Sequence, residues 1–362
     1  MKNSISVGNI QIFTILTLFL ILYLPYIFNG GLLLDDLGFI NPIKEGTSYI
    51  EYQKWMSSFV TMTARPVSAL LHGFSYWNFG INYQLFHALN LALFLTSILL
   101  FYFSIGRTIS YEVAFLTAIF CLTYPGSSST TFSSIMMNSN LSASLYALAL
   151  LVSTYKIRFR YIYIFLALVL SALSYEAFIP LFLFIPFSGL LQNQFKIKGS
   201  EFINNSIPVI GAIFTYFLYK KYFEHVIFGT DFTRVRFFTG SEYIERIKYV
   251  LNRTHELTTN HLFTTTITSL KNISPADITM SLGVAVLIGI CLSFQSGLLP
   301  AAHNHKIRKL LRPISWETYL KYLIFAIVLF YASTSIYLFS GYLPIILGFE
   351  NRTLGAIDFL HH

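Results

Sequence analysis

Two adjacent carboxylates, Asp35 and Asp36, stand directly after an apolar run in the stretch GGLLLDDLGFINP, residues 30–42. Adjacent carboxylates repel each other, so such a pair accepts a proton more readily than a lone aspartate and can act as a general base. An ordinary alternative is that one of them caps the start of a helix, as aspartate often does. The pair alone leaves both roles open.

Arg65 and Glu176 are the next candidates. Arg65 is followed by Pro66, which marks the start of a helix, and its guanidinium can bind a phosphate group in a bidentate way. Glu176, next to Tyr175 in LSYEAFIP, stands between two apolar runs. A charged side chain at mid-bilayer costs roughly 2.5–3.5 kcal/mol, so Glu176 needs water, a partner or a ligand. The alternatives are an ordinary interfacial arginine and a surface glutamate that breaks a helix.

Three further positions carry weaker signals. His87 and Asn90 in FHALN are three residues apart and so share one face of a helix. A histidine within a span is more often a hydrogen-bonding contact between helices. His72 is weaker, with an exposed surface position as its alternative. Arg352, in FENRTLG, follows the last apolar block.

The composition sets the class of protein that must position these residues. Hydrophobic residues make up 55% of the 362 residues and charged residues 11%, and the apolar residues come in long blocks. This is typical of a polytopic, all-α membrane protein. The first block follows a single lysine and is expected to be a retained membrane anchor. Cys121 and Cys291 fall inside apolar blocks and are expected to be core residues, not disulfide or metal ligands.

About nine spans are predicted, because each crossing needs about 20 apolar residues. The fifth and sixth are short, and Ser174, Tyr175 and Glu176 interrupt them, so these two spans are predicted to form a tight hairpin. The predicted spans are 9–28, 84–105, 109–125, 139–155, 161–174, 177–191, 206–223, 281–297 and 321–343.

The distribution of lysine and arginine in the short loops predicts a cytoplasmic N-terminus. The loops that would then be cytoplasmic are basic, whereas the segment between Pro125 and Asn138 has no lysine or arginine. Asp35 and Asp36 would therefore lie on the outer side, in a first outer loop covering residues 29–83. The cytoplasmic basic residues are Lys2, Arg107, Lys156, Arg158, Arg160, Lys196, Lys198, Lys306, Arg308, Lys309 and Arg312.

The first outer loop is predicted to contain two helices that lie in the membrane interface. Residues 48–62 and 67–79 have the helical spacing of apolar residues that suits such a position. These helices would cover the outer surface above the aspartates. Residues 224–280 form the only candidate for an outer-side subdomain, with a helix expected in SEYIERIKYVLNRTHEL, where Ile244, Ile247 and Leu251 share a face.

The ordered set of features resembles the multi-span GT-C glycosyltransferases. The matching stretches are LLLDD, then ARPVSALLHGFSYWNFGINYQLFHALNLALF, then LTYPGSSSTTFSSIMMNSNLSASLY, then ALSYEAFIPL. The closest likeness is to bacterial serotype-converting glucosyltransferases that modify O-antigen. It covers residues 9–190 well, so we interpret residues 1–223 as a GT-C-like module, followed by 224–280 and C-terminal helices in 281–362.

The resemblance implies inverting transfer of a hexose from a polyprenyl-phosphate-linked donor to a lipid-linked surface glycan, with glucose as the expected hexose. It implies that Asp35, or else Asp36, is the catalytic base, and that Arg65 and Arg352 stabilise the leaving phosphate. His72, His87, Asn90, Tyr175 and Glu176 would shape the cavity or bind the acceptor. Two positions depart from the family pattern: Phe94, where a histidine often stands, and Tyr175, where many relatives have lysine.

These features also define the expected surroundings. The chain contains no glycine-rich phosphate loop or Rossmann-like segment for a nucleotide sugar, so a donor held in the bilayer is expected. The net charge of +8 favours anionic lipids and a phosphorylated substrate; no nucleic-acid partner and no cofactor is predicted, and a divalent metal is left open. The expected location is the bacterial inner membrane, with the active site on the periplasmic side. A flippase or transporter for lipid-linked saccharide, and an O-antigen polymerase using Arg234 and Arg236, are the alternatives.

Overall fold

The computed structural model describes residues 7–31, 47–58, 62, 64–123, 136–192, 199–223 and 240–256, together with single positions between 267 and 327. Within these residues every regular element is helical, which confirms the predicted all-α class for the part described. The predicted spans 281–297 and 321–343 lie almost wholly outside the described residues.

In the part of the chain that the structure describes, three helices are long and apolar enough to cross a membrane: Gly8–Asn29, Tyr83–Thr108 and Gly199–Tyr222. They belong to α1 (Val7–Asn29), α6 (Tyr83–Thr108) and α13 (Gly199–Leu218). The shorter helices are α7 (Tyr111–Thr123), α9 (Met137–Ser153), α10 (Arg160–Ser174), α11 (Ile179–Phe182) and α12 (Phe184–Gln192). These helices all fall where an apolar block predicted a span, but among the described helices length and composition support a crossing for three.

The two helices predicted in the first outer loop are present as α3 (Tyr49–Ser58) and α5 (Pro66–Phe79). The helix predicted after residue 240 is α15 (Gly240–Glu256). The boundary of α13 was predicted less well: the helix begins at Gly199, not near residue 206. Its first turns contain Glu201, Asn204 and Asn205, which hydropathy alone does not assign to a span.

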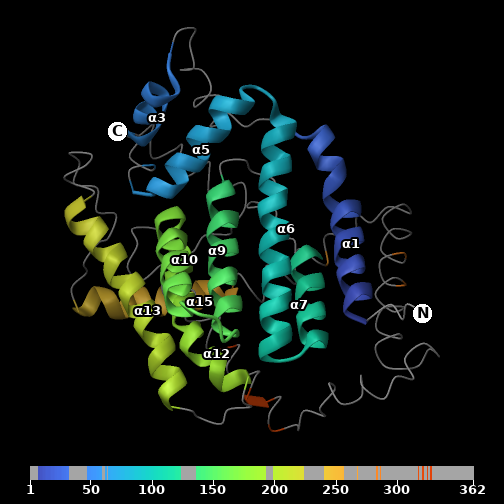
Figure 1. Cartoon of the computed structure of the whole chain (residues 1–362), viewed down its shortest axis with the longest axis vertical. Coiled ribbons are helices and arrows are strands. Elements are labelled where there is room, and N and C mark those ends of the chain that lie inside the picture. The colour runs from blue at the N-terminus through green and yellow to red at the C-terminus, as the bar shows by residue number, and fades with distance from the viewer. Residues whose placement is uncertain are drawn as a thin grey trace.

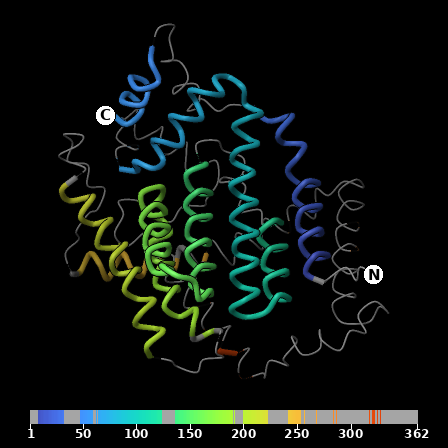
Figure 2. Tube along the Cα trace, viewed as in Figure 1, coloured from blue at the N-terminus to red at the C-terminus, as the bar shows by residue number. Residues whose placement is uncertain are grey.

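The helices form two groups, and α5 contacts both of them. Helices α1, α6 and α7 lie beside one another, and α9, α10, α12 and α13 form the other group (Figure 1). Helix α5 lies across the upper ends of α9 and α10 and contacts α6 as well, and α3 packs on α5 (Figure 2). The C-terminal ends of α1, α10 and α13 and the N-terminal ends of α6 and α9 therefore lie at the same end of the bundle, where α5 covers α9 and α10 (Figure 1).

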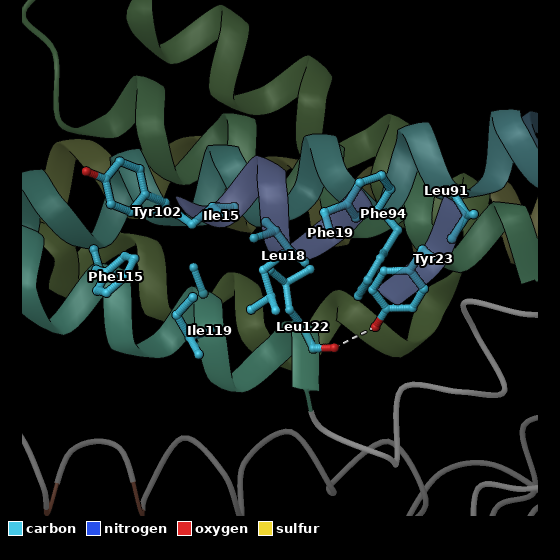
Figure 3. Close-up of a cluster of buried hydrophobic side chains, with 13 residues drawn as sticks. Ile15, Leu18, Phe19, Tyr23, Leu91, Phe94, Tyr102, Phe115, Ile119 and Leu122 are labelled. Atoms are coloured by element: carbon cyan, nitrogen blue, oxygen red, sulfur yellow. Dashed lines mark hydrogen bonds between the residues drawn. The ribbon is translucent and has the colours of Figure 1, made fainter. Parts of the chain in front are cut away.

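The first group packs around a continuous apolar core. Ile15, Leu18, Phe94 and Phe115 are buried there with their neighbours from α1, α6 and α7 (Figure 3). The Tyr23 hydroxyl donates a hydrogen bond of 2.7 Å to the carbonyl of Leu122, at the end of α7. This bond satisfies one of the carbonyls that a helix leaves unpaired at its C-terminus.

Helix α9 joins the two groups by close packing through small and polar residues. The Ser144 hydroxyl donates to the carbonyl of Leu93 on α6 at 2.9 Å, and the Ser104 hydroxyl of α6 donates to the carbonyl of Ala147 at 3.2 Å. Small residues let helices approach closely enough for such bonds to form in an apolar environment. The polar character of α9 thus serves its position between α6 and α10.

Candidate functional site

An ion pair between Arg65 and Glu176 lies at the end of the bundle that α5 covers. Arg65 Nε donates to Glu176 Oε2 at 2.8 Å, and Arg65 Nη2 donates to Oε1 at 2.7 Å. The two side chains are 17% and 27% exposed, and the guanidinium carbon lies 4.5 Å from the centre of the Tyr175 ring. The sequence suggested that Glu176 needs a partner, and the partner is Arg65, 111 residues away.

The backbone at Arg65 and at Glu176 orients the two side chains toward each other. Arg65 occupies the position before α5, and Pro66 is its first residue, which fixes where the helix begins. On the other side, α10 ends at Ser174, and Tyr175 is extended, with φ −158° and ψ 114°. This break is followed by a short 3-10 turn, η3 (Glu176–Phe178), and confirms the predicted interruption at residues 174–176.

Hydroxyl groups hold this break against α9. The Ser142 hydroxyl lies 2.9 Å from the carbonyl oxygen of Ser171 and 3.1 Å from that of Tyr175. The Ser171 hydroxyl donates in return to the carbonyl of Ser142 at 2.9 Å. The single proton of the Ser142 hydroxyl can serve either of these carbonyls at the C-terminal end of α10, and the contacts hold the backbone from which Tyr175 and Glu176 project against α9.

The charges in this group reinforce each other. Burial by itself would raise the pKa of Glu176, but the Arg65 charge and its two hydrogen bonds outweigh burial, and Lys220 adds to the effect, so the pKa of Glu176 lies well below its usual value. Burial likewise opposes the charge on Arg65, yet the Glu176 carboxylate raises the pKa of Arg65 above its ordinary value. Both groups are ionised at neutral pH.

Lys220 is the residue of this group that the sequence did not single out. It lies in the π-helical turn Tyr219–Phe223 (η4) that ends α13, and its ammonium group donates to the carbonyl of Ala64 at 2.9 Å. Ala64 directly precedes Arg65, so a third element brings a charge to the same place. A lysine at the outer end of the predicted span 206–223 was the available signal, because lysine near a span is more common on the cytoplasmic side.

His87 joins the start of α6 to the end of α1. Its Nε2 atom lies 3.1 Å from the carbonyl oxygen of Gly31, which can only accept, so Nε2 carries the proton. The ring packs against Tyr26, with centroids 4.4 Å apart, and Tyr83 donates to the carbonyl of Phe28 at 3.0 Å. The backbone just after α1 is therefore hydrogen-bonded to α6 at Gly31. This residue stands four positions before Asp35 in the sequence.

We expect Gly30→Ala to destabilise the protein by about 1–3 kcal/mol, the usual cost of forcing an extra methyl group into a packed site. A Cβ at Gly30 would lie 2.7 Å from the carbonyl oxygen of Tyr26 and 2.9 Å from His87 Nε2. Gly31→Ala is the matched control, because a Cβ there meets nothing within 4 Å. Unfolding of the two purified variants measures the difference, and equal stability would contradict this packing of His87.

Asn90 contacts a different helix from His87. The Asn140 Nδ2 group donates to Asn90 Oδ1 at 2.7 Å, which links α6 to α9 through two buried amides. His87 and Asn90 do lie one turn apart on α6 and are both buried. In the described residues their contacts are with other helices, as the interhelical alternative suggested, and a role toward an acceptor stays a prediction.

His72 lies inside α5 and not on the surface. Its side chain is fully buried, and the ring is stacked on Tyr76 with centroids 5.8 Å apart. The alternative of an exposed surface position is therefore wrong. His72 is buried because α5 packs against α3 on one side and against α6, α9 and α10 of the bundle.

The remaining candidates, Asp35, Asp36 and Arg352, lie outside the described residues. Of the others, Arg65, Tyr175 and Glu176 come together in one group with Lys220, whereas His87 and Asn90 lie on α6 with contacts to α1 and α9. Among the residues that are described, no three histidine, cysteine or acidic side chains are grouped so as to hold a metal ion. A comparison of the chain with protein-family models, curated proteins and solved structures finds no match.

Proposed function

We propose that this chain is a GT-C-type glycosyltransferase. It would transfer a hexose, with glucose as the first candidate, from a polyprenyl-phosphate-linked donor to a lipid-linked surface glycan such as O-antigen. The reaction would take place on the periplasmic side of a bacterial inner membrane. The observation that carries this proposal is the charged group of Arg65, Glu176 and Lys220, which lies among apolar helices at the end of the bundle covered by α5.

Charged side chains in such surroundings are costly and usually mark a functional site. Glu176 occupies two of the five N–H groups of Arg65, on the Nε and Nη2 side. The Nη1 side is the one that a phosphate could contact. A donor whose tail lies in the bilayer would bring its phosphate to the ends of the helices, where this group lies.

The proposed reaction is a direct displacement at the anomeric carbon. The acceptor hydroxyl attacks this carbon while its proton passes to the carboxylate of Asp35. The bond from the anomeric carbon to the phosphate oxygen breaks, and its electron pair stays on that oxygen. The phosphate changes from one negative charge to two, and nearby cations stabilise this charge.

The orientation in this proposal rests on the basic residues at the opposite end of the bundle. Arg107 lies in the last turn of α6, and its guanidinium carbon lies 3.8 Å from the centre of the ring of Tyr155, just beyond α9. Lys156, Arg158 and Arg160 follow in the same short connection. Basic residues in short loops favour the cytoplasmic side of the membrane. In this proposal the opposite end of the bundle, with Arg65, Glu176 and Lys220, therefore faces the periplasm.

The direct test is transfer by the purified protein in lipid nanodiscs. It is incubated with a panel of polyprenyl-phosphoryl hexoses, with and without an O-antigen acceptor, and released polyprenyl phosphate is measured. We expect release from one donor, and only when acceptor is present. If no donor is consumed while the protein moves lipid-linked saccharide across vesicle bilayers, the transporter alternative holds and the transferase proposal fails.

A further inference from the structure

Two guanidinium groups from different helices meet at Tyr155, at the end of the bundle opposite to Arg65 and Glu176 (Figure 1). The guanidinium carbon of Arg107, in the last turn of α6, lies 3.8 Å from the centre of the Tyr155 ring. Arg160, the first residue of α10, donates from Nη1 to the carbonyl of Tyr155 at 3.4 Å. Tyr155 lies just beyond the end of α9, so the ends of three helices converge there.

The charges at this place repel each other. Lys156 and Arg158 stand between Tyr155 and Arg160 in the sequence, and both are exposed. In the part of the chain that the structure describes, no carboxylate forms an ion pair with any of these basic residues or with Arg107. Bringing like charges together is unfavourable, and an anion placed between them removes the cost.

Apolar side chains alternate with these charges. Tyr155, Ile157 and Phe159 are 38%, 46% and 55% exposed. The guanidinium carbon of Arg158 lies 4.8 Å from the centre of the Phe159 ring. Aromatic rings beside long basic side chains are typical of the level at which lipid headgroups meet water, because one end of each side chain is apolar and the other polar.

The backbone of this connection has an unusual conformation. Phe159 directly precedes α10 with φ 62° and ψ 19°, in the left-handed region. A bulky residue rarely adopts this conformation, and such strain is concentrated at functional sites. The preference of basic residues for the cytoplasmic side depends on their number in a loop. It requires neither this conformation nor the shared contact at Tyr155.

We propose that this surface binds the headgroups of anionic phospholipids. We call it the basic surface, and its cations are Arg107, Lys156, Arg158 and Arg160. A lipid fits better than a soluble anion, because α6 is long enough to cross a membrane and Arg107 lies in its last turn, at the level of the headgroups. The phosphate would reduce the repulsion between the cations, and the acyl chains would cover Ile157 and Phe159. The surface lies at the other end of the bundle from the proposed donor site, and the proposal does not depend on glycosyl transfer.

Lipid binding by the purified protein tests the proposal. The detergent-solubilised protein is titrated with phosphatidylglycerol, or with zwitterionic phosphatidylethanolamine, and bound lipid is counted by native mass spectrometry. We expect Arg107→Gln with Arg160→Gln to weaken phosphatidylglycerol binding about tenfold or more, since each basic residue near anionic lipid contributes about fivefold. Binding of phosphatidylethanolamine should stay unchanged.

Two further double variants separate this surface from general attraction and from misfolding. Lys54→Gln with Lys221→Gln is the matched control, because it removes two exposed charges at the other end of the bundle, and it should change binding less than about twofold. Arg107→Lys with Arg160→Lys keeps both charges, and with them the signal for membrane orientation. It should bind within about threefold of the unchanged protein.

Lys156→Gln with Arg158→Gln keeps the proposal testable if the Arg107 and Arg160 variant does not fold. Both side chains are exposed, so the fold should tolerate their loss, and phosphatidylglycerol binding should again fall about tenfold or more. Inorganic phosphate should not displace the lipid, whereas displacement at equal concentration would show a site for soluble phosphate and overturn the proposal. An equal loss in the matched control, an equal loss for phosphatidylethanolamine, or full binding by both glutamine variants of the basic surface would also overturn it.

Discussion

Glu176→Gln is expected to lower the free energy of unfolding by about 3 kcal/mol. Removing one partner of a buried ion pair costs about 3–5 kcal/mol, because the other charge stays buried without compensation. The lower end of this range applies because 27% of the Glu176 side chain is exposed. Unfolding of the detergent-solubilised protein measures the loss. Glu245→Gln on α15, an exposed position, should stay within about 0.5 kcal/mol of the unchanged protein.

A double substitution identifies the ion pair as the cause. In Arg65→Met with Glu176→Met neither charge is left unpaired, so the double variant should be less destabilised than the two single variants added together. Additive losses would mean that Arg65 and Glu176 act independently, in conflict with the two hydrogen bonds between them.

The same pair gives the stability a defined pH dependence. Because the pKa of Glu176 is lower in the folded protein than in the unfolded chain, its contribution is fully present above the unfolded value of about 4.3. It is lost as the pH falls through the lower, folded value. The unchanged protein should thus lose stability more steeply below about pH 4 than Glu176→Gln does. Parallel curves would contradict the depressed pKa.

Apolar blocks were sufficient to predict where most helices lie, because a helix in an apolar environment satisfies its own backbone and needs only a long apolar sequence. The interruption at Ser174–Glu176 was predictable for the same reason, since polar residues stand between two short runs. The start of α13 was not predictable from the apolar blocks, because Glu201 and Asn205 belong to the helix but not to the block.

The pairing of Arg65 with Glu176 could be predicted only in part. The energetic cost of Glu176 among apolar residues called for a partner. Several cations were candidates, however, and a single sequence does not say which helices are neighbours. The choice depends on the break after α10, on the position of α5 across the bundle and on the π-helical turn that brings Lys220 in. The burial of His72 likewise depends on how α5 packs against its neighbouring helices.

Asp35→Asn is expected to abolish transfer, with kcat lowered about 10²–10⁴-fold, the usual contribution of a general base. The amide has the shape of the carboxylate but cannot accept the proton of the acceptor hydroxyl. The donor should still bind, because the proposed phosphate contact comes from Arg65 and not from Asp35. Radiolabelled sugar transfer in nanodiscs gives kcat, and binding of polyprenyl phosphate gives the donor affinity.

Asp36→Asn is the matched control, since it removes the same charge one residue later. A smaller loss in Asp36→Asn than in Asp35→Asn would assign the base to Asp35, and the reverse order would assign it to Asp36. Full activity in both variants, with both folded and inserted, would sink the transferase proposal. If glycan chain lengthening instead depended on Arg234 and Arg236 with the aspartates dispensable, the polymerase alternative would hold.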